Sequence, residues 1–170
     1  MRGPRRIWTA VAALFVVGVL ALVVEGRLDA ADRGLSTDGA TVVHYTLASK
    51  LLGRLDEVAI VPAGDGSRPL LVLLHGRHDP RPGSSPNSHK SGPESMLSSA
   101  LLAGLAQLGG DAPVVVLLNG GQHSWYNDRR AGRWGSMILD EAMPDAINRF
   151  QARTDRIAIG GISMGGYGAL

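Results

Sequence analysis

Two uninterrupted apolar runs lie near the middle of the chain, at residues 70–74 (LLVLL) and 114–118 (VVVLL). Runs of this length, each followed by a turn, are typical of strands that are covered on both faces of a parallel sheet. Between them, residues 94–108 carry small and apolar side chains at helical spacing, with Pro93 suited to the first turn and Gly109-Gly110 suited to the end. The pattern predicts a strand, a helix and a second, parallel strand.

Shorter patterns extend this unit on both sides. Residues 42–47 and 55–61 alternate in the manner of strands and predict an antiparallel hairpin or edge pair. Residues 136–152 predict a helix that Pro144 kinks or restarts, and residues 156–160 predict a further strand. Strands and helices therefore alternate without an internal repeat, which favours an open α/β sheet, mostly parallel and flanked by helices.

The first 28 residues have a different pattern. Residues 7–24 carry no charge, and three arginines precede them. This run of 18 residues lies at the short end of the ~17–25 that span a bilayer, and it exceeds the ~7–15 of a signal-peptide core. We expect residues 1–28 to be a signal anchor, or alternatively a cleaved signal peptide, followed by a linker at 29–40 and a globular domain at 41–170. The domain would then be exported, either anchored on the outer face of the cytoplasmic membrane or secreted.

The charge of the chain argues against a nucleic-acid partner. The formal net charge is +2, but residues 1–27 alone contribute +3, and the remaining 143 residues carry 13 basic and 14 acidic side chains. No basic stripe of the kind that neutralises phosphates is left in the domain. Because the chain has no cysteine, a disulfide, a thiolate metal site and a cysteine nucleophile are excluded.

The candidate nucleophile is Ser163, in the sequence Gly161-Ile-Ser-Met-Gly165. This G-x-S-x-G motif directly follows the predicted strand at 156–160 and precedes residues that can start a helix. It resembles the sharp strand-to-helix turn on which α/β hydrolases present a serine hydroxyl. Alone the motif occurs by chance in glycine-rich chains, so its position after the strand is what makes it informative.

A second turn points to the same chemistry. The buried strand at 70–74 is followed by His75-Gly76-Arg77, where an α/β hydrolase builds half of its oxyanion hole from backbone N–H groups. We expect the N–H groups of Met164 and Arg77 to be the two donors. His75 is expected to bond loop backbone, since the histidine of the triad comes last in the chain order of these enzymes.

With these motifs the chain resembles the putative-esterase branch of the α/β hydrolases, which includes esterase D-like enzymes, feruloyl esterases and mycolyltransferases. The resemblance covers residues 41–170 and includes residues 120–128 (GGQHSWYND), which are similar to a mycolyltransferase segment beside the active site. It implies a pocket lined by residues from this loop and from the histidine turn: His75, His123, Trp125, Tyr126 and Asp128. The aromatic side chains of the loop would contact substrate or pack the loop onto the domain.

The resemblance implies a serine carboxylic-ester hydrolase that works through an acyl-serine intermediate on an ester or an acyl-donor lipid, without cofactor or metal. Alternatives are acyl transfer to a sugar or lipid hydroxyl, and a non-catalytic surface protein that binds ligand through the loop around Trp125. In the family the acidic and histidine members of the triad follow the nucleophile, whereas this sequence has seven residues after Ser163. A serine needs a base to become nucleophilic, so we expect these 170 residues to be the front part of the enzyme and to be inactive alone.

Overall fold

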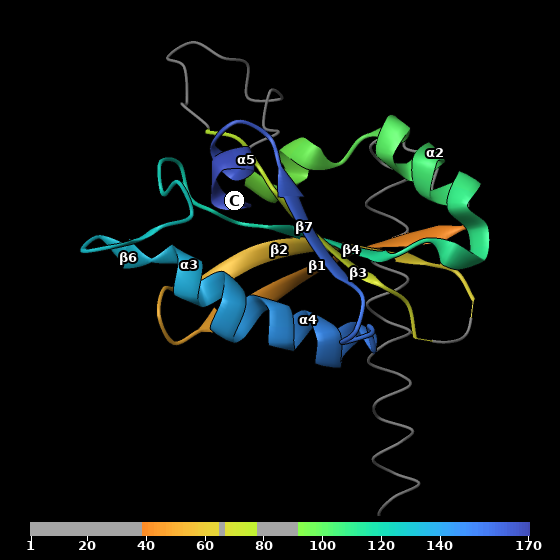
Figure 1. The fold of residues 1–170 in the computed structure, drawn as a ribbon, viewed down its shortest axis with the longest axis horizontal. Coiled ribbons are helices and arrows are strands. Elements are labelled where there is room, and N and C mark those ends of the chain that lie inside the picture. The colour runs from red at the N-terminus through yellow and green to blue at the C-terminus, as the bar shows by residue number, and fades with distance from the viewer. Residues whose placement is uncertain (1–38, 65–66, 78–91) are drawn as a thin grey trace, which may run out of the picture.

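The computed structural model describes residues 39–64, 67–77 and 92–170. Its centre is a five-stranded sheet in the order β1-β2-β4-β3-β7 (Figure 1). The strands are β1 (Ala40–Ser49), β2 (Gly53–Pro62), β3 (Leu70–Leu74), β4 (Val114–Leu118) and β7 (Ile157–Gly161). β1 and β2 form the predicted antiparallel pair, β2 joins β4 antiparallel, and β3 lies parallel to both β4 and β7. The predicted α/β sheet and its antiparallel edge pair are therefore confirmed, but the sheet is mixed rather than mostly parallel, because β2 joins β4 antiparallel.

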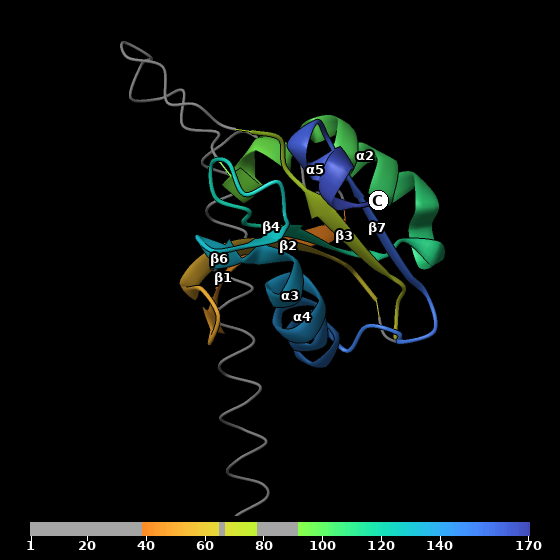
Figure 2. The same ribbon diagram turned by 60° about the vertical axis from the view of Figure 1, so that its left-hand side comes forward.

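Helices cover the two faces of this sheet (Figure 2). One face carries α2 (Ser99–Leu108), and the other carries a continuous helical segment made of α3 (Trp134–Met137), a π-helical turn η3 (Ile138–Ala142) and α4 (Met143–Phe150). A short helix, α5 (Met164–Gly168), follows β7. The remaining short elements are η1 (Gly92–Met96), η2 (Gly109–Asp111) and a small hairpin of β5 (Asp128–Arg129) and β6 (Gly132–Arg133).

Alternation along the strands divides the core into two clusters. On β2, Ala59 belongs to the cluster under α3 and α4, whereas Ile60 belongs to the cluster under α2. β4 contributes to both clusters in the same alternating way, and all of its side chains are buried. Burial on both faces explains why its sequence is apolar without interruption.

Both predicted helices differ in detail from the expectation. Residues 94–108 are not one helix, because the Ser98 side chain accepts a hydrogen bond from the Leu101 N–H and starts α2 there, after the 3₁₀ turn that contains Pro93. The predicted end is confirmed, since α2 stops at Gly109. The second helix begins earlier than expected, at Trp134, and the π-helical turn immediately precedes the α4 turn that contains Pro144. A π turn at this point accommodates the proline, which lacks an N–H to donate.

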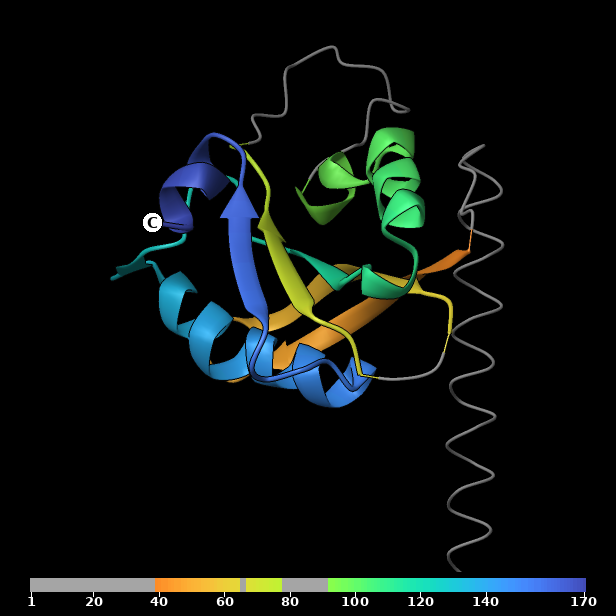
Figure 3. The ribbon, with the colours of Figure 1, turned by 45° about the vertical axis from the view of Figure 1, so that its right-hand side comes forward.

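The strand order brings two loops to one edge of the sheet. β3 lies between β4 and β7 in the sheet (Figure 3). The chain leaves β3 toward β4 on one side, and β7 lies on the other side, so the carboxyl ends of β3 and β7 are neighbours. Open α/β sheets place their sites at such a point. Gly39 and Ala40, where the described domain begins, lie at the opposite edge, since Ala40 pairs with the last residue of β2.

The predicted membrane segment at residues 7–24 lies outside the described residues, as do residues 78–91. Within the described ranges, none of the helices has the length and apolar character that a membrane span requires.

Candidate active site

Ser163 lies between the end of β7 and the start of α5, in the sharp turn that the motif predicts. Its φ is 53° and its ψ is −114°, a region that non-glycine residues rarely adopt. The side chain is exposed, and the preceding Ile162 N–H donates to the Leu74 carbonyl at 3.1 Å, which ties the turn to β3. A serine in this conformation is presented at the carboxyl edge of the sheet.

Two glycines allow this turn to approach β3 closely. A Cβ atom at Gly165 would lie 2.0 Å from the Leu74 carbonyl oxygen, and one at Gly161 would lie 2.4 Å from the carbonyl of Gly165. Because these contacts are with backbone rather than with flexible side chains, no rotamer change could relieve them. The glycines of the motif are therefore required by packing.

The turn after β3 lies directly beside Ser163. A Cβ atom at Gly76 would lie 3.5 Å from the Ser163 Cβ and 3.4 Å from the Ile162 carbonyl oxygen. Met164 is fully buried at the start of α5, and Arg77 is exposed. The two turns predicted to supply oxyanion donors are thus neighbours in the fold.

His75 is buried, with 1% of its surface exposed, and its ring contacts two different turns. Its Nδ1 is 2.7 Å from the Gly76 carbonyl oxygen, and its Nε2 is 3.0 Å from the Gly120 nitrogen. Since a carbonyl only accepts and a backbone N–H only donates, these contacts fit a neutral ring protonated on Nδ1. His75 therefore bonds loop backbone, as the sequence predicted.

The aromatic loop after β4 has one buried and one partly exposed ring. Tyr126 is 3% exposed, and its hydroxyl donates to the His75 carbonyl at 3.2 Å. Its ring passes so close to Gly120 that a Cβ there would lie 2.2 Å from it. Trp125 is 36% exposed and meets Tyr167 of α5 edge-on, with ring centroids 5.7 Å apart. Tyr126 thus packs the loop onto the domain, while Trp125 is exposed beside the Ser163 turn.

Two other predicted pocket residues lie further along the same loop. His123 is exposed and helps to line a cavity of about 270 Å³ together with Arg129 and Trp134. Asp128 accepts hydrogen bonds from the N–H and the hydroxyl of Ser136 near the start of α3, at 2.9 and 2.5 Å. These bonds from Ser136, with a contribution from Arg133, lower the pKa of Asp128. Asp128 therefore stabilises the start of the helix, and it is not among the residues that line this cavity.

Sequence reasoning missed two residues next to this site, Glu57 and Asn119. Glu57 is 1% exposed, and its Oε2 accepts the Asn119 N–H at 2.5 Å; the Asn119 side chain in turn accepts the Gly121 N–H at 2.9 Å. Burial, only partly offset by the hydrogen bond from Asn119, raises the pKa of Glu57 to about 8. The signal was present, because Glu57 stands on the same face of β2 as Leu55 and Ala59, where an apolar residue is expected.

The described residues supply a serine and backbone donors, but no activating base in contact with the serine. Within residues 39–64, 67–77 and 92–170, the Ser163 hydroxyl makes no hydrogen bond to a histidine or a carboxylate. The same ranges contain no group of three side chains able to hold a metal ion. The arrangement could bind the oxygen of a carbonyl group between the two turns.

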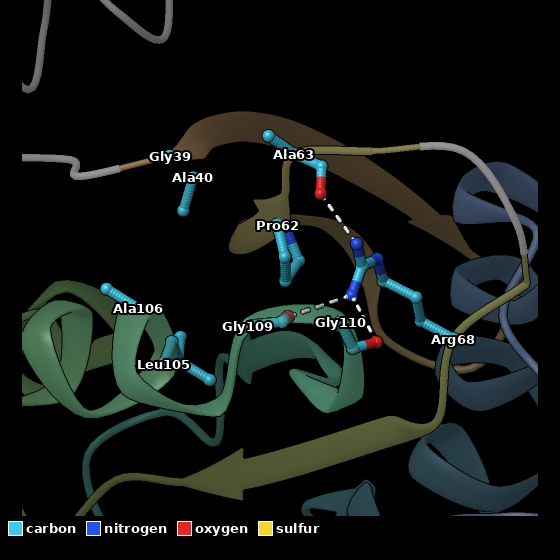
Figure 4. Close-up of a pocket in the computed structure, with 9 residues that line it drawn as sticks. All are labelled: Gly39, Ala40, Pro62, Ala63, Arg68, Leu105, Ala106, Gly109 and Gly110. Carbon is cyan, nitrogen blue, oxygen red and sulfur yellow. Dashed lines mark hydrogen bonds between the residues drawn. The ribbon is translucent and has the colours of Figure 1, made fainter.

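A second cavity, of about 280 Å³, lies at the opposite edge of the sheet, near Gly39 and Pro62 (Figure 4). Its one charged side chain, Arg68, points at backbone carbonyls: Nη2 donates to Ala63 at 2.6 Å, and Nη1 donates to Gly110 at 2.9 Å and to two neighbouring carbonyls. A cation at the carboxyl end of a helix is favourable, because it satisfies free carbonyls there. Arg68 therefore joins α2 to the end of β2 and does not belong to the candidate site.

Comparisons with known proteins reveal likeness in structure. No protein-family model matches the sequence, and no curated protein matches it significantly. An S-formylglutathione hydrolase from Agrobacterium tumefaciens superposes with a TM-score of 0.54 at 16% identity, over 79% of this chain and 53% of the other. MPT51 (FbpC1) from Mycobacterium tuberculosis superposes with a TM-score of 0.52 at 20% identity, over 76% and 44%. This chain thus spans about half the length of either structure. At the level of the fold, these neighbours confirm the resemblance to the esterase D-like and mycolyltransferase-like α/β hydrolases.

Proposed function

We propose that the protein is a serine carboxylic-ester hydrolase in which Ser163 forms the acyl intermediate. The observation that carries the proposal is the contact between two turns: Ser163, with its φ of 53°, lies against Gly76 at the carboxyl ends of two adjacent parallel strands. An exposed serine in such a turn, next to a second turn at the carboxyl end of the adjacent strand, fits the arrangement that acyl transfer requires.

In the proposed reaction, Ser163 Oγ attacks the carbonyl carbon of the ester and loses its proton to a general base. The N–H groups of Met164 and Arg77 stabilise the oxyanion, the C–O bond to the alcohol breaks, and the base returns the proton to the leaving alkoxide. Water then attacks the acyl-serine and loses a proton to the same base; the bond between the acyl carbon and Ser163 Oγ breaks, the base returns the proton to Oγ, and the acid is released. In the family that this chain resembles, the base and its carboxylate come after the nucleophile turn in the sequence. The described residues alone are therefore expected to be inactive.

The proposal is tested by the hydrolysis of p-nitrophenyl esters with the natural protein, including any residues that its gene encodes after Leu170. Ser163→Ala should lower kcat by on the order of 10³-fold or more, since the proposed acyl intermediate forms on the Ser163 hydroxyl. Ser99→Ala removes an exposed serine from the first turn of α2 and should keep the full rate. Equal rates in Ser163→Ala and in the natural protein would exclude Ser163 as the nucleophile.

Acyl transfer to a hydroxyl is the second candidate function. The partly exposed Trp125 ring, which contacts the Tyr167 ring, favours it. Aromatic surface with polar handles next to the nucleophile could hold a sugar or a lipid acceptor. Adding trehalose or glycerol to the same assay separates the two reactions, because a transferase would form the acylated acceptor. If neither reaction occurs and a ligand still binds near Trp125, the protein is a non-catalytic binder.

Residues 7–24 are proposed to anchor the protein in a membrane, or to direct its secretion if cleaved, on the basis of their composition. The described domain begins at Gly39, at the edge of the sheet opposite Ser163. An anchor before Gly39 would therefore leave Ser163 on the edge away from the attachment point. Fractionation that recovers the full-length protein only from cytosol would contradict the anchor.

A further inference from the structure

The carboxyl group of Glu57 lies inside the domain, on the sheet face that α3 and α4 cover. Its strand neighbours on that face, Leu55 and Ala59, belong to the apolar core, and Tyr45 is its partner across the β1-β2 pair. One oxygen, Oε2, accepts the Asn119 N–H, whereas the buried Oε1 has no hydrogen-bond partner. An acidic side chain at an apolar position costs free energy, so its presence needs a reason.

The acceptor that Glu57 supplies fixes the first residue after β4. The Asn119 N–H donates to Glu57, and the Asn119 side chain accepts the Gly121 N–H, which closes the turn over Gly120. The Gly120 N–H is thereby directed toward His75 Nε2, at 3.0 Å. The Asn119–Gly121 turn is therefore held by hydrogen bonds at Asn119 and Gly121, and its middle residue, Gly120, donates to His75.

The same chain of contacts continues to the candidate oxyanion turn. His75 receives the Gly120 N–H on Nε2 and donates from Nδ1 to the Gly76 carbonyl. Gly76 lies so close to Ser163 that a Cβ at Gly76 would be 3.5 Å from the Ser163 Cβ, and its carbonyl shares a peptide bond with the Arg77 N–H. The orientation of that N–H therefore depends on the His75 ring, whose orientation depends on the turn that Glu57 holds.

The surroundings of Glu57 favour the neutral acid. Its ionisable neighbours are Tyr45 and Tyr126, both of which keep their protons because burial and the nearby carboxyl raise their pKa, and Asp56 on its own strand. His75 is joined to the same turn through Nε2 and to the Gly76 carbonyl through Nδ1. From the covering helix, Arg149 forms an ion pair with Asp145 and packs over the Tyr45 ring.

We infer that Glu57 is a positioning residue that holds the Asn119–Gly121 turn against His75 and so fixes the Gly76-Arg77 backbone beside Ser163. The last step, from backbone position to catalysis, rests on the proposed function. The earlier steps concern the fold alone and can be tested without turnover.

Ionisation of Glu57 should change the turn, because it places a charge in the apolar core and strengthens the hydrogen bond from the Asn119 N–H. The pKa of Glu57 is raised from 4.5 to about 8, so the stability that the neutral acid contributes is complete below pH 4.5. It declines as the pH rises, because the unfolded chain ionises first, and the loss is complete once Glu57 itself ionises above about pH 8. The contacts of His75 should change in that last interval.

The test follows the His75 ring nitrogens by NMR in protein labelled with ¹⁵N-histidine, assigned by the loss of signal in His75→Asn. In the natural protein we expect signals of an Nδ1-protonated ring that shift with one midpoint near pH 8. Glu57→Gln keeps an acceptor for Asn119 but cannot ionise, so the shift should disappear. Asp56→Asn, which changes an exposed carboxylate on the same strand, should retain it.

Glu57→Leu separates positioning from simple packing. A leucine fills the space without accepting the Asn119 N–H, so the His75 signals should move even if the variant is as stable as the natural protein. An unchanged midpoint in Glu57→Gln, or His75 signals unaffected by Glu57→Leu, would overturn the inference. If these results hold but Ser163→Ala leaves ester hydrolysis intact, the positioning is real and the proposed function is wrong.

Discussion

Strands β4 and β7 both lack polar side chains, both lie parallel to β3, and both end at the candidate site, yet their environments differ. Every residue of β4 is buried, whereas Ile157 and Ile159 of β7 are each 38% exposed. The reason is strand order: β4 lies between β2 and β3, and β7 pairs only with β3 in the described part of the chain. An apolar run therefore predicts a strand, but its burial depends on neighbours that the run itself does not specify.

The same contrast applies to the two turns that these strands help to place. The turn after β4 is held from inside, through Glu57, His75 and Tyr126, by hydrogen bonds between buried groups. The Ser163 turn after β7 is exposed, and it is held by the close approach of its glycine backbone to Leu74. One turn is positioned by side chains and the other by the absence of side chains.

The largest expected effect compares the two strands directly. Leu118→Ala in β4 removes a fully buried side chain and should lower the free energy of unfolding by about 2–5 kcal/mol. Ile159→Ala in β7 removes a half-exposed one and should cost about 1 kcal/mol, because part of the side chain is already in water. Urea unfolding of both variants gives the difference, and equal losses would mean that β7 is as well covered in solution as β4.

The second prediction concerns the packing of the two turns against each other. Gly165→Ala would place a Cβ 2.0 Å from the Leu74 carbonyl, so the backbone must move, at a cost of about 1–3 kcal/mol. Gly76→Ala is the matched control, since its Cβ would meet Ile162 and Ser163 at 3.4 and 3.5 Å, near ordinary contact. The control should lose well under 1 kcal/mol on the same scale. A tolerated Gly165→Ala would show that the Ser163 turn is looser than described.

Much of this fold could be predicted because its central strands combine a strong pattern with a clear end. β3 and β4 match their predicted bounds to the residue, and the pairing of β1 with β2 follows from two short strands close in sequence. The start of α2 was predicted too early, because a capping bond from Ser98 is a matter of geometry that helical spacing does not reveal.

The candidate site was predicted unevenly for a similar reason. The G-x-S-x-G motif is local, so the turn at Ser163 could be anticipated from five residues. Glu57 is 62 residues away from Asn119 in sequence, and only the sheet brings them together. Its position among apolar residues of β2 was a visible anomaly, but which group it would meet depended on the order of β2, β4 and β3.

The smallest expected effect tests whether the exposed turn stores strain. Ser163 has a φ of 53°, which glycine adopts readily and serine does not, so Ser163→Gly should raise the free energy of unfolding by about 1 kcal/mol. Ser99→Gly, at an exposed position of α2 with ordinary helical geometry, should instead lower it by about 0.5–1 kcal/mol. Thermal unfolding of the two variants in the same buffer gives the sign of each change in the free energy of unfolding. If Ser163→Gly is destabilising like its control, the turn is not strained in solution. Opposite signs would mean that this turn keeps a serine at a cost in stability, which is expected where the side chain is retained for chemistry rather than for folding.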